Sequence, residues 1–231
     1  MRDLLRDPAI RGTTDVSHTV VAVASSSSKS RAEKFIADTG VPAPCAAYGS
    51  YEELVADPAI DVVYVATPHS HHFQNVMLAL HAGKPVLCEK AFTVNAAQTR
   101  ILCDTAKQKN LFLMEAVWTR YFPLSVQIRD LIRAGAIGEV LRVVADNSFG
   151  DNVEEKWRTT HRMVNKDLAG GCLLDCTFHF LARTVFVSLL FGEASANYRQ
   201  WASTPSPGSS KPSTTHFPVS SANHLPPYLP T

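Results

Sequence analysis

Residues 83–90 read Gly83-Lys84-Pro85-Val86-Leu87-Cys88-Glu89-Lys90 and place a carboxylate beside an ammonium at the end of a short apolar strand. In an open α/β sheet, ligands bind at the carboxyl ends of the strands. The preceding segment, Ile60 to Ala66, has the β-branched character of a buried strand. It is followed by Thr67-Pro68-His69-Ser70-His71-His72 and by a helix expected from Phe73 to Ala82. Two successive strands are therefore predicted to end in polar clusters that face one crevice.

The segments around this stretch alternate between strand and helix patterns. Strands are expected at 19–24, 42–48, 60–66, 85–89, 111–115 and 138–149, and helices at 30–39, from 50 onward, and at 73–82, 95–109 and 124–134. Ser50 and Glu53 fit a capping box at the start of the second helix. Strands separated by helices of about 10 to 15 residues indicate βαβ units. The predicted fold class is α/β, with a doubly wound, Rossmann-like parallel sheet.

Composition excludes several classes of protein. The 231 residues include 22 Lys and Arg against 21 Asp and Glu, so a net charge of +1 gives no broad field for nucleic acid or an anionic membrane. Five cysteines form no CxxC pair, which favours reduced thiols and a cytoplasmic protein. Cys88, Cys172 and Cys176 are expected to be small buried side chains. The sequence predicts neither a signal peptide nor an apolar run long enough to span a bilayer.

Both ends of the chain differ from a complete dinucleotide-binding protein. No GxGxxG or GxGxxA occurs, so the first strand and its glycine-rich phosphate loop are expected to be missing. Residues 198–231 hold seven of the fourteen prolines, seven serines and no acidic residue, and are expected to be disordered. The predicted domains are a dinucleotide-binding domain over 1–122 without its first strand, a truncated α+β substrate and dimerisation domain over 123–197, and the tail.

Two blocks of sequence carry a resemblance to a known family. The run from Val62 to Lys90, with Ala66-Thr67-Pro68-His69 and Gly83 to Lys90, resembles the glucose-fructose oxidoreductase and inositol dehydrogenase family. Within it, the block Phe112 to Pro123 is similar to the dimeric dihydrodiol dehydrogenases and the fungal NADP-dependent D-xylose dehydrogenases. The resemblance extends over about residues 1 to 180. It implies a nicotinamide-binding domain followed by a sheet domain that shapes a sugar or diol site.

The resemblance also implies roles for individual residues. Lys90 matches the family's catalytic lysine, although Glu89-Lys90-Ala91 replaces the usual Glu-Lys-Pro. Asp175 and His179 match the family pattern Asp-x-Gly-x-His, with Thr177 in place of the glycine. The dihydrodiol branch typically has a tyrosine acid/base at the last position, whereas a histidine is common elsewhere in the family. By residue pattern alone, Asp175 and His179 could equally be a structural pair on one helix face.

Ser25-Ser26-Ser27-Ser28-Lys29-Ser30-Arg31 stands at the end of a strand, where NAD-specific sites usually carry an acid. Hydroxyls with a nearby arginine suit the 2′-phosphate, so Ser25, Ser26 and Arg31 predict NADP as the cofactor. The alternative is that the serines simply cap a helix. The residues expected to contact the rest of the cofactor stand at the ends of two strands: Thr67, Pro68, His69, His72, Glu89 and Lys90.

The other polar clusters also allow two interpretations. Glu89 and Lys90 alone could be a surface ion pair, and the histidines at 69, 71 and 72 could suggest zinc. We expect no metal, because His-x-His-His lacks a fourth ligand at helical spacing. Trp118 and Arg120 could line a substrate pocket or pack between domains, and Arg162 is a weaker candidate substrate contact.

These observations lead to a hypothesis of an NADP-dependent dehydrogenase that oxidises a D-xylose-like sugar or a trans-dihydrodiol by hydride transfer. Its expected partner is this small molecule, without nucleic acid or membrane, and the family's homodimer is not expected for this chain. A non-catalytic NAD(P)-sensing regulator of the same fold is the alternative. A further possibility is that the chain is a truncated enzyme, inactive by itself.

Overall fold

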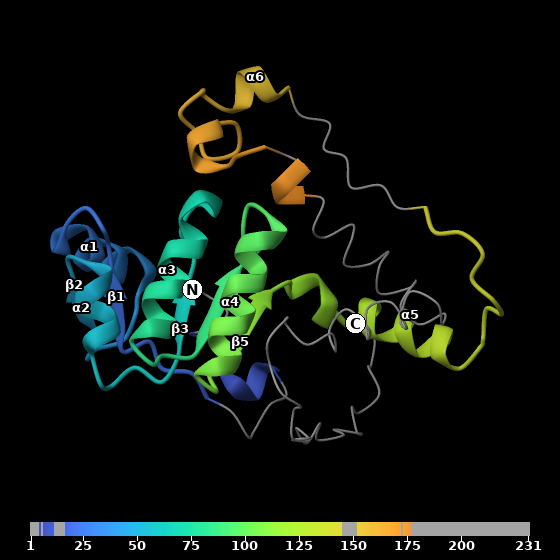
Figure 1. The fold of residues 1–231 in the computed structure, drawn as a ribbon, viewed down its shortest axis with the longest axis horizontal. Helices are drawn as coiled ribbons and strands as arrows, with labels where there is room; N and C mark the ends of the chain where they lie inside the picture. Colours follow the sequence, from blue (N-terminus) through green and yellow to red (C-terminus); the bar gives the residue numbers. More distant parts are fainter. Residues whose placement is uncertain (1–4, 6, 12–16, 145–151, 172, 177–231) are drawn as a thin grey trace, which may run out of the picture.

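The computed structural model describes residues 5, 7–11, 17–144, 152–171 and 173–176 of the chain. Strands and helices alternate over its first half: β1 (Ala22–Ala24), α1 (Lys29–Thr39), β2 (Ala46–Tyr48), α2 (Tyr51–Ala56), β3 (Val63–Val65), α3 (His69–His81), β4 (Val86–Glu89), α4 (Ala96–Gln108) and β5 (Leu113–Ala116). The remaining elements are α5 (Pro123–Arg133), α6 (Val153–Lys156) and three short 3-10 helices, η1 (Pro8–Arg11), η2 (Trp118–Tyr121) and η3 (Lys166–Leu168). This order confirms the predicted α/β class (Figure 1).

All strand pairs in the described residues are parallel, as in a Rossmann-like fold. They form two pieces rather than one continuous sheet: β1 with β2, and β3 with β4 with β5. In the second piece Cys88 of β4 pairs with Val65 of β3 on one side and with Glu115 of β5 on the other. The carboxyl ends of β3, β4 and β5 therefore lie at one edge, which confirms the shared edge expected from the sequence.

The best-packed part of the molecule is the contact of α3 and α4 with β3 and β4. Val76, Ala79 and Leu80 of α3 are fully buried, as are Val86 of β4 and Leu102 of α4. Burying a side chain such as Leu80 completely contributes about 1.5–3 kcal/mol. This packing fixes the position of β4, and hence the position of Glu89 and Lys90 at its carboxyl end.

Helix starts follow local capping chemistry. The Ser50 hydroxyl accepts from the Glu53 backbone N–H at 3.1 Å, as the predicted capping box requires. The Glu53 carboxylate, however, accepts from the Gly49 N–H at 3.0 Å, one residue earlier than expected. Asn95 caps α4 in the same way, through the Gln98 N–H at 2.9 Å.

Two expected elements differ from the structure. Helix α3 begins at His69 rather than Phe73, because Pro68 directly precedes it with a φ of −59°, which suits a helix start. The histidine cluster therefore lies on the first turn of a helix. The strand expected over 138–149 is wrong for residues 138–144, which form no strand and leave Leu141 and Val144 exposed. No described strand lies beside them to pair with, and the rest of that stretch, 145–149, lies outside the described residues.

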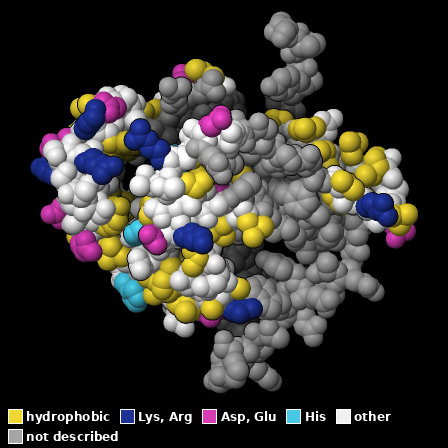
Figure 2. Space-filling model, turned by 90° about the horizontal axis from the view of Figure 1, so that it is seen from above, with side chains coloured by type: hydrophobic (Ala, Val, Ile, Leu, Met, Phe, Trp, Pro, Cys, Tyr) yellow, Lys and Arg dark blue, Asp and Glu magenta, His cyan; other side chains and the backbone are white. Residues whose placement is uncertain are grey.

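Helix α5 lies away from the sheet and carries apolar side chains on its surface. It buries Ile132 but leaves Leu124, Ile128 and Leu131 exposed. Figure 2 shows these hydrophobic side chains gathered at the right of the molecule, at the place that α5 occupies in Figure 1. Proline at the first position of α5 suits a helix start.

Candidate active site

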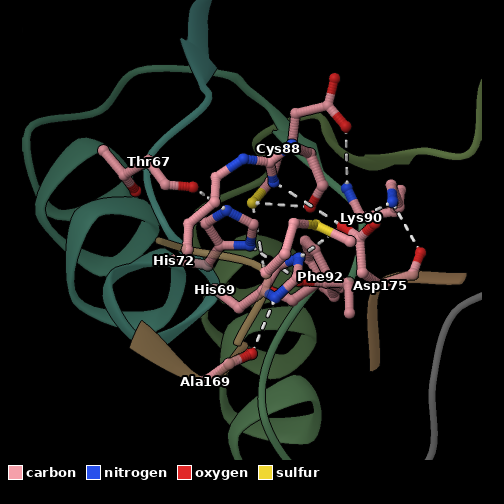
Figure 3. A network of polar contacts seen from close by, with 12 residues as sticks. Thr67, His69, His72, Cys88, Lys90, Phe92, Ala169 and Asp175 are labelled. Atoms are coloured by element: carbon pink, nitrogen blue, oxygen red, sulfur yellow. Dashed lines mark hydrogen bonds and ion pairs between the residues drawn. The ribbon is translucent and has the colours of Figure 1, made fainter. Parts of the chain in front are cut away.

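Lys90 and Asp175 form the centre of the polar network at the end of β4 (Figure 3). The Lys90 Nζ donates to the Asp175 Oδ1 at 2.9 Å and to the Asp175 backbone oxygen at 2.6 Å. Both side chains are largely buried, with 13% and 14% exposed. The contact joins β4 to residues 173–176, which are helical. An ammonium has three donors, so these two bonds leave one N–H of Lys90 for a further acceptor.

Asp175 also faces two other cationic or ionisable groups. The His69 Nε2 lies 3.6 Å and the Arg162 Nη1 3.7 Å from the Asp175 Oδ1. Burial by itself would raise the pKa of Asp175, but the hydrogen bond from Lys90 and the positive charges around it hold that pKa below its ordinary value. Asp175 is therefore an ionised carboxylate at neutral pH. It gathers predicted catalytic and substrate residues into one cluster.

The first turn of α3 connects this cluster to the ends of β3 and β4. His72 is fully buried, and its Nδ1 and Nε2 each lie 2.7 Å from a carbonyl oxygen, of Ala91 and Thr67 respectively. Burial lowers the pKa of His72, although both carbonyls favour the charged ring. A neutral ring has one N–H, so it donates to one of these two carbonyls at a time.

His69 and Thr67 complete the end of β3. The His69 Nδ1 lies 3.0 Å from the oxygen of Ala169, the residue after η3, and η3 itself contacts α3. Because a carbonyl only accepts, this nitrogen carries a proton. The Thr67 hydroxyl accepts from the Asn75 Nδ2 at 3.1 Å, and Pro68 precedes the helix. The structure thus brings Thr67, Pro68, His69, His72, Glu89 and Lys90 together at one sheet edge.

Two further residues of this site were not singled out by sequence reasoning. The Tyr64 hydroxyl donates to the Glu89 Oε1, and the Glu115 Oε1 accepts from the Phe92 N–H at 2.9 Å. Burial and the bond to Glu89 raise the pKa of Tyr64, and burial raises the pKa of Glu115. Both residues stand inside strands, and a strand pattern alone does not distinguish their side chains from the rest of the sheet. In the sequence, the one feature that could have indicated them is a polar side chain at or near the carboxyl end of each strand.

The serine-rich loop lies between β1 and α1, apart from the Lys90 cluster. The Ser28 hydroxyl caps α1 by accepting from the Arg31 N–H at 3.3 Å. The alternative expected from the sequence, that the serines cap a helix, therefore holds for Ser28. Ser25 and Ser27 hydroxyls lie 2.9 Å apart, and the Arg31 Nη1 donates to the Ser27 hydroxyl at 3.4 Å. Ser25, Ser26 and Arg31 thus stand around one exposed turn. Capping and anion binding use the same kinds of group, so both can occur here.

The remaining predicted residues fall in two groups. Trp118 lies on η2, half exposed, with its ring against Phe122 at a centroid distance of 4.9 Å, and the Arg120 backbone oxygen accepts from Arg129. Arg162, by contrast, approaches the Asp175 carboxylate of the central cluster. His179 and the tail 198–231 lie outside the described residues. The expected proximity of His179 to Lys90 therefore stays a prediction.

The part of the chain that the structure describes shows neither a cluster of metal ligands nor a helix suited to a bilayer. The described residues contain no group of three or more His, Cys, Asp or Glu side chains that could hold a metal ion. None of the described helices has the length and apolar character needed to cross a bilayer. Cys88 and Cys176 are buried as expected, while Cys172 is not among the described residues.

Comparisons with known proteins give the relatives of this chain. The sequence model of the GFO/IDH/MocA oxidoreductase family, which has an NAD-binding Rossmann fold, matches residues 7–117. The chain is 65% identical over 178 residues to D-xylose 1-dehydrogenase (NADP(+)) of Hypocrea jecorina, covering 75% of this chain and 46% of that protein. It is 43% identical over 175 residues to human trans-1,2-dihydrobenzene-1,2-diol dehydrogenase, covering 76% of this chain and 48% of that protein.

A solved structure gives the same result for the fold. The aldose-aldose oxidoreductase of Caulobacter crescentus, complexed with glycerol, superimposes with a TM-score of 0.64 at 25% identity over 75% of this chain and 50% of that one. The chain spans about half the length of the curated relatives it matches. By its sequence, its strand order and its relatives, the chain belongs to the GFO/IDH/MocA oxidoreductase family.

Proposed function

We propose that this chain provides the central residues of an NADP-dependent dehydrogenase that oxidises a D-xylose-like sugar or a trans-dihydrodiol by hydride transfer. The observation that carries the proposal is the buried contact between Lys90 and Asp175, made across 85 residues of sequence at the carboxyl end of β4. Polar groups at this edge of a parallel sheet lie where cofactor and substrate bind in such folds. The relatives named D-xylose 1-dehydrogenase (NADP(+)) and trans-1,2-dihydrobenzene-1,2-diol dehydrogenase support the two substrate classes.

The chemistry assigns separate tasks to these residues. When bound, the nicotinamide cofactor accepts a hydride from the substrate carbon. The remaining N–H of Lys90 donates to the substrate hydroxyl and holds it in place, while the hydrogen bond to Asp175 orients the ammonium. We assign the acceptance of the hydroxyl proton to His179 by its match to the family pattern. Trp118, Arg120 and Arg162 are proposed to contact the sugar or diol.

The cofactor is proposed to lie between two groups of residues. Ser25, Ser26 and Arg31 offer hydroxyls and a guanidinium for a 2′-phosphate, which an acidic side chain would repel. Thr67, Pro68, His69, His72, Glu89 and Lys90 would border the nicotinamide half. In this account residues 1–122 bind the cofactor, 123–197 contribute to the substrate side and 198–231 form a tail. A cytoplasmic location and a small-molecule partner belong to the same proposal.

A chimera tests the proposal and allows for the length of the chain. The segment of this chain that aligns with the Hypocrea D-xylose dehydrogenase replaces its counterpart in that enzyme, and NADPH formation is followed by absorbance. We expect oxidation of D-xylose or a trans-dihydrodiol with NADP⁺ in preference to NAD⁺. Arg31→Ala should reduce the preference for NADP⁺ by about tenfold or more, as expected for one charged contact. A folded chimera that binds the cofactor without turnover of either substrate class contradicts the proposal and favours a sensor.

A further inference from the structure

The segment that carries Lys90 is held by side chains rather than by a neighbouring strand. After β4 ends, the Lys90 N–H donates to the Glu89 Oε2 at 3.2 Å, and the Ala91 oxygen faces His72 at 2.7 Å. The Phe92 N–H donates to the Glu115 Oε1 at 2.9 Å. Three successive residues are thus fixed by carboxylates from β4 and β5 and an imidazole from α3.

The carboxylate of Glu115 is costly to bury at its position in β5. It pairs with Cys88 in the sheet, in surroundings buried enough to raise the pKa of its carboxyl group. Glu89 is a further negative charge near it, and Arg120 and Lys90 are the positive charges that oppose it. An apolar side chain would be easier to bury here, because a carboxylate loses hydration that a single N–H bond only partly replaces. The hydrogen bond from the Phe92 N–H partly offsets this loss of hydration.

We infer that Glu115 is a positioning residue that holds Lys90 against Asp175 by fixing the Phe92 backbone two residues further along. Phe92 is itself buried, so removal of the carboxylate leaves a buried backbone N–H without its acceptor. The segment must then shift to satisfy this donor, and Lys90 shifts with it. Only the link from this position to turnover rests on the proposed function. The contact itself can be measured without substrate or cofactor.

The test observes the lysine ammonium directly in the full chain. In a two-dimensional ¹H–¹⁵N spectrum of lysine NH₃⁺ groups, the signal of Lys90 is identified by its loss in Lys90→Arg. We expect Glu115→Ala to shift or abolish this signal. Glu115→Gln retains an acceptor of the same shape and should keep the signal near its original position. Leu113→Ala is the matched control, since it removes a partly buried side chain from the same strand and leaves the Glu115 acceptor of the Phe92 N–H in place.

Two outcomes overturn the inference. One is a Lys90 signal that stays in place in Glu115→Ala. The other is an equal shift in Leu113→Ala, which would mean that any loss of packing in β5 moves the Lys90 signal. A measurement on the unsubstituted chain decides the matter if Glu115→Ala does not fold. The Phe92 amide should exchange with solvent at least about a hundredfold more slowly than in an unstructured peptide. Exchange at the unstructured rate contradicts the contact with Glu115.

Discussion

The sheet β3–β4–β5 with α3 and α4 differs from α5 in how its apolar side chains are used. Leu80 and Leu102 are fully buried in the first region, whereas Leu124 and Leu131 of α5 are exposed. The polar residues follow the same division. Lys90 and Asp175 are largely buried and form an ion pair, whereas Trp118, on the short helix η2 that precedes α5, is half exposed. The comparison shows that the candidate site is built where the backbone is fixed on several sides by packing.

The largest expected effect tests this division of packing. Leu80→Ala should reduce the free energy of unfolding by about 3 kcal/mol, because it leaves a cavity in a site with no exposed surface. Leu131→Ala on α5 should cost about 0.5 kcal/mol, since its side chain is 44% exposed. Urea denaturation of both variants measures the difference. Equal losses would mean that α5 is as firmly packed as the sheet.

The next effect compares a buried ion pair with an exposed one. A double-mutant cycle on Lys90→Met and Asp175→Ala should give a coupling of about 2 kcal/mol. The same cycle on Lys34 and Asp38 of α1, which are 73% and 59% exposed, should give about 0.3 kcal/mol. Both couplings are obtained from denaturation at neutral pH. A coupling at Lys90 no larger than that at Lys34 would remove the central contact of the proposed site.

A smaller effect separates two carboxylates by pH. The pKa of Asp175 is lowered on folding from 3.8, so its contribution to stability is complete above that value and is lost as the pH falls through the folded pKa. The pKa of Glu115 is raised from 4.5, so the stability linked to its protonated form is present below 4.5 and lost as the pH rises through the folded pKa.

The two carboxylates are distinguished by isosteric substitution. Asp175→Asn should flatten the acid side of the stability profile below about pH 4, and Glu115→Gln should remove the loss of stability that sets in as the pH rises above about 4.5. Urea denaturation across this range measures both. Profiles that change in the same direction for the two variants would show that their surroundings are alike.

Prediction from sequence succeeded where the information was local. The strand ending at Glu89 and the helix capped by Ser50 follow from short patterns, and both are confirmed. Asp175 was identified through the family pattern alone, because no local rule relates it to Lys90 across 85 residues. Glu115 was missed because its contact with Phe92 depends on the register of β4 and β5. The strand expected after Gly138 was wrong over 138–144, since strand formation requires a partner that the pattern cannot supply.

The central claim is that the ammonium of Lys90 acts on the substrate beside the nicotinamide. Single-turnover NADPH formation in the D-xylose dehydrogenase chimera measures this most directly, with Lys90→Met compared with Lys109→Met, a substitution at the far end of α4. We predict that Lys90→Met slows hydride transfer by at least about a hundredfold, as removal of a positioned donor does, while Lys109→Met leaves it unchanged. Equal rates in the two variants, with NADP⁺ bound in both, would contradict the account.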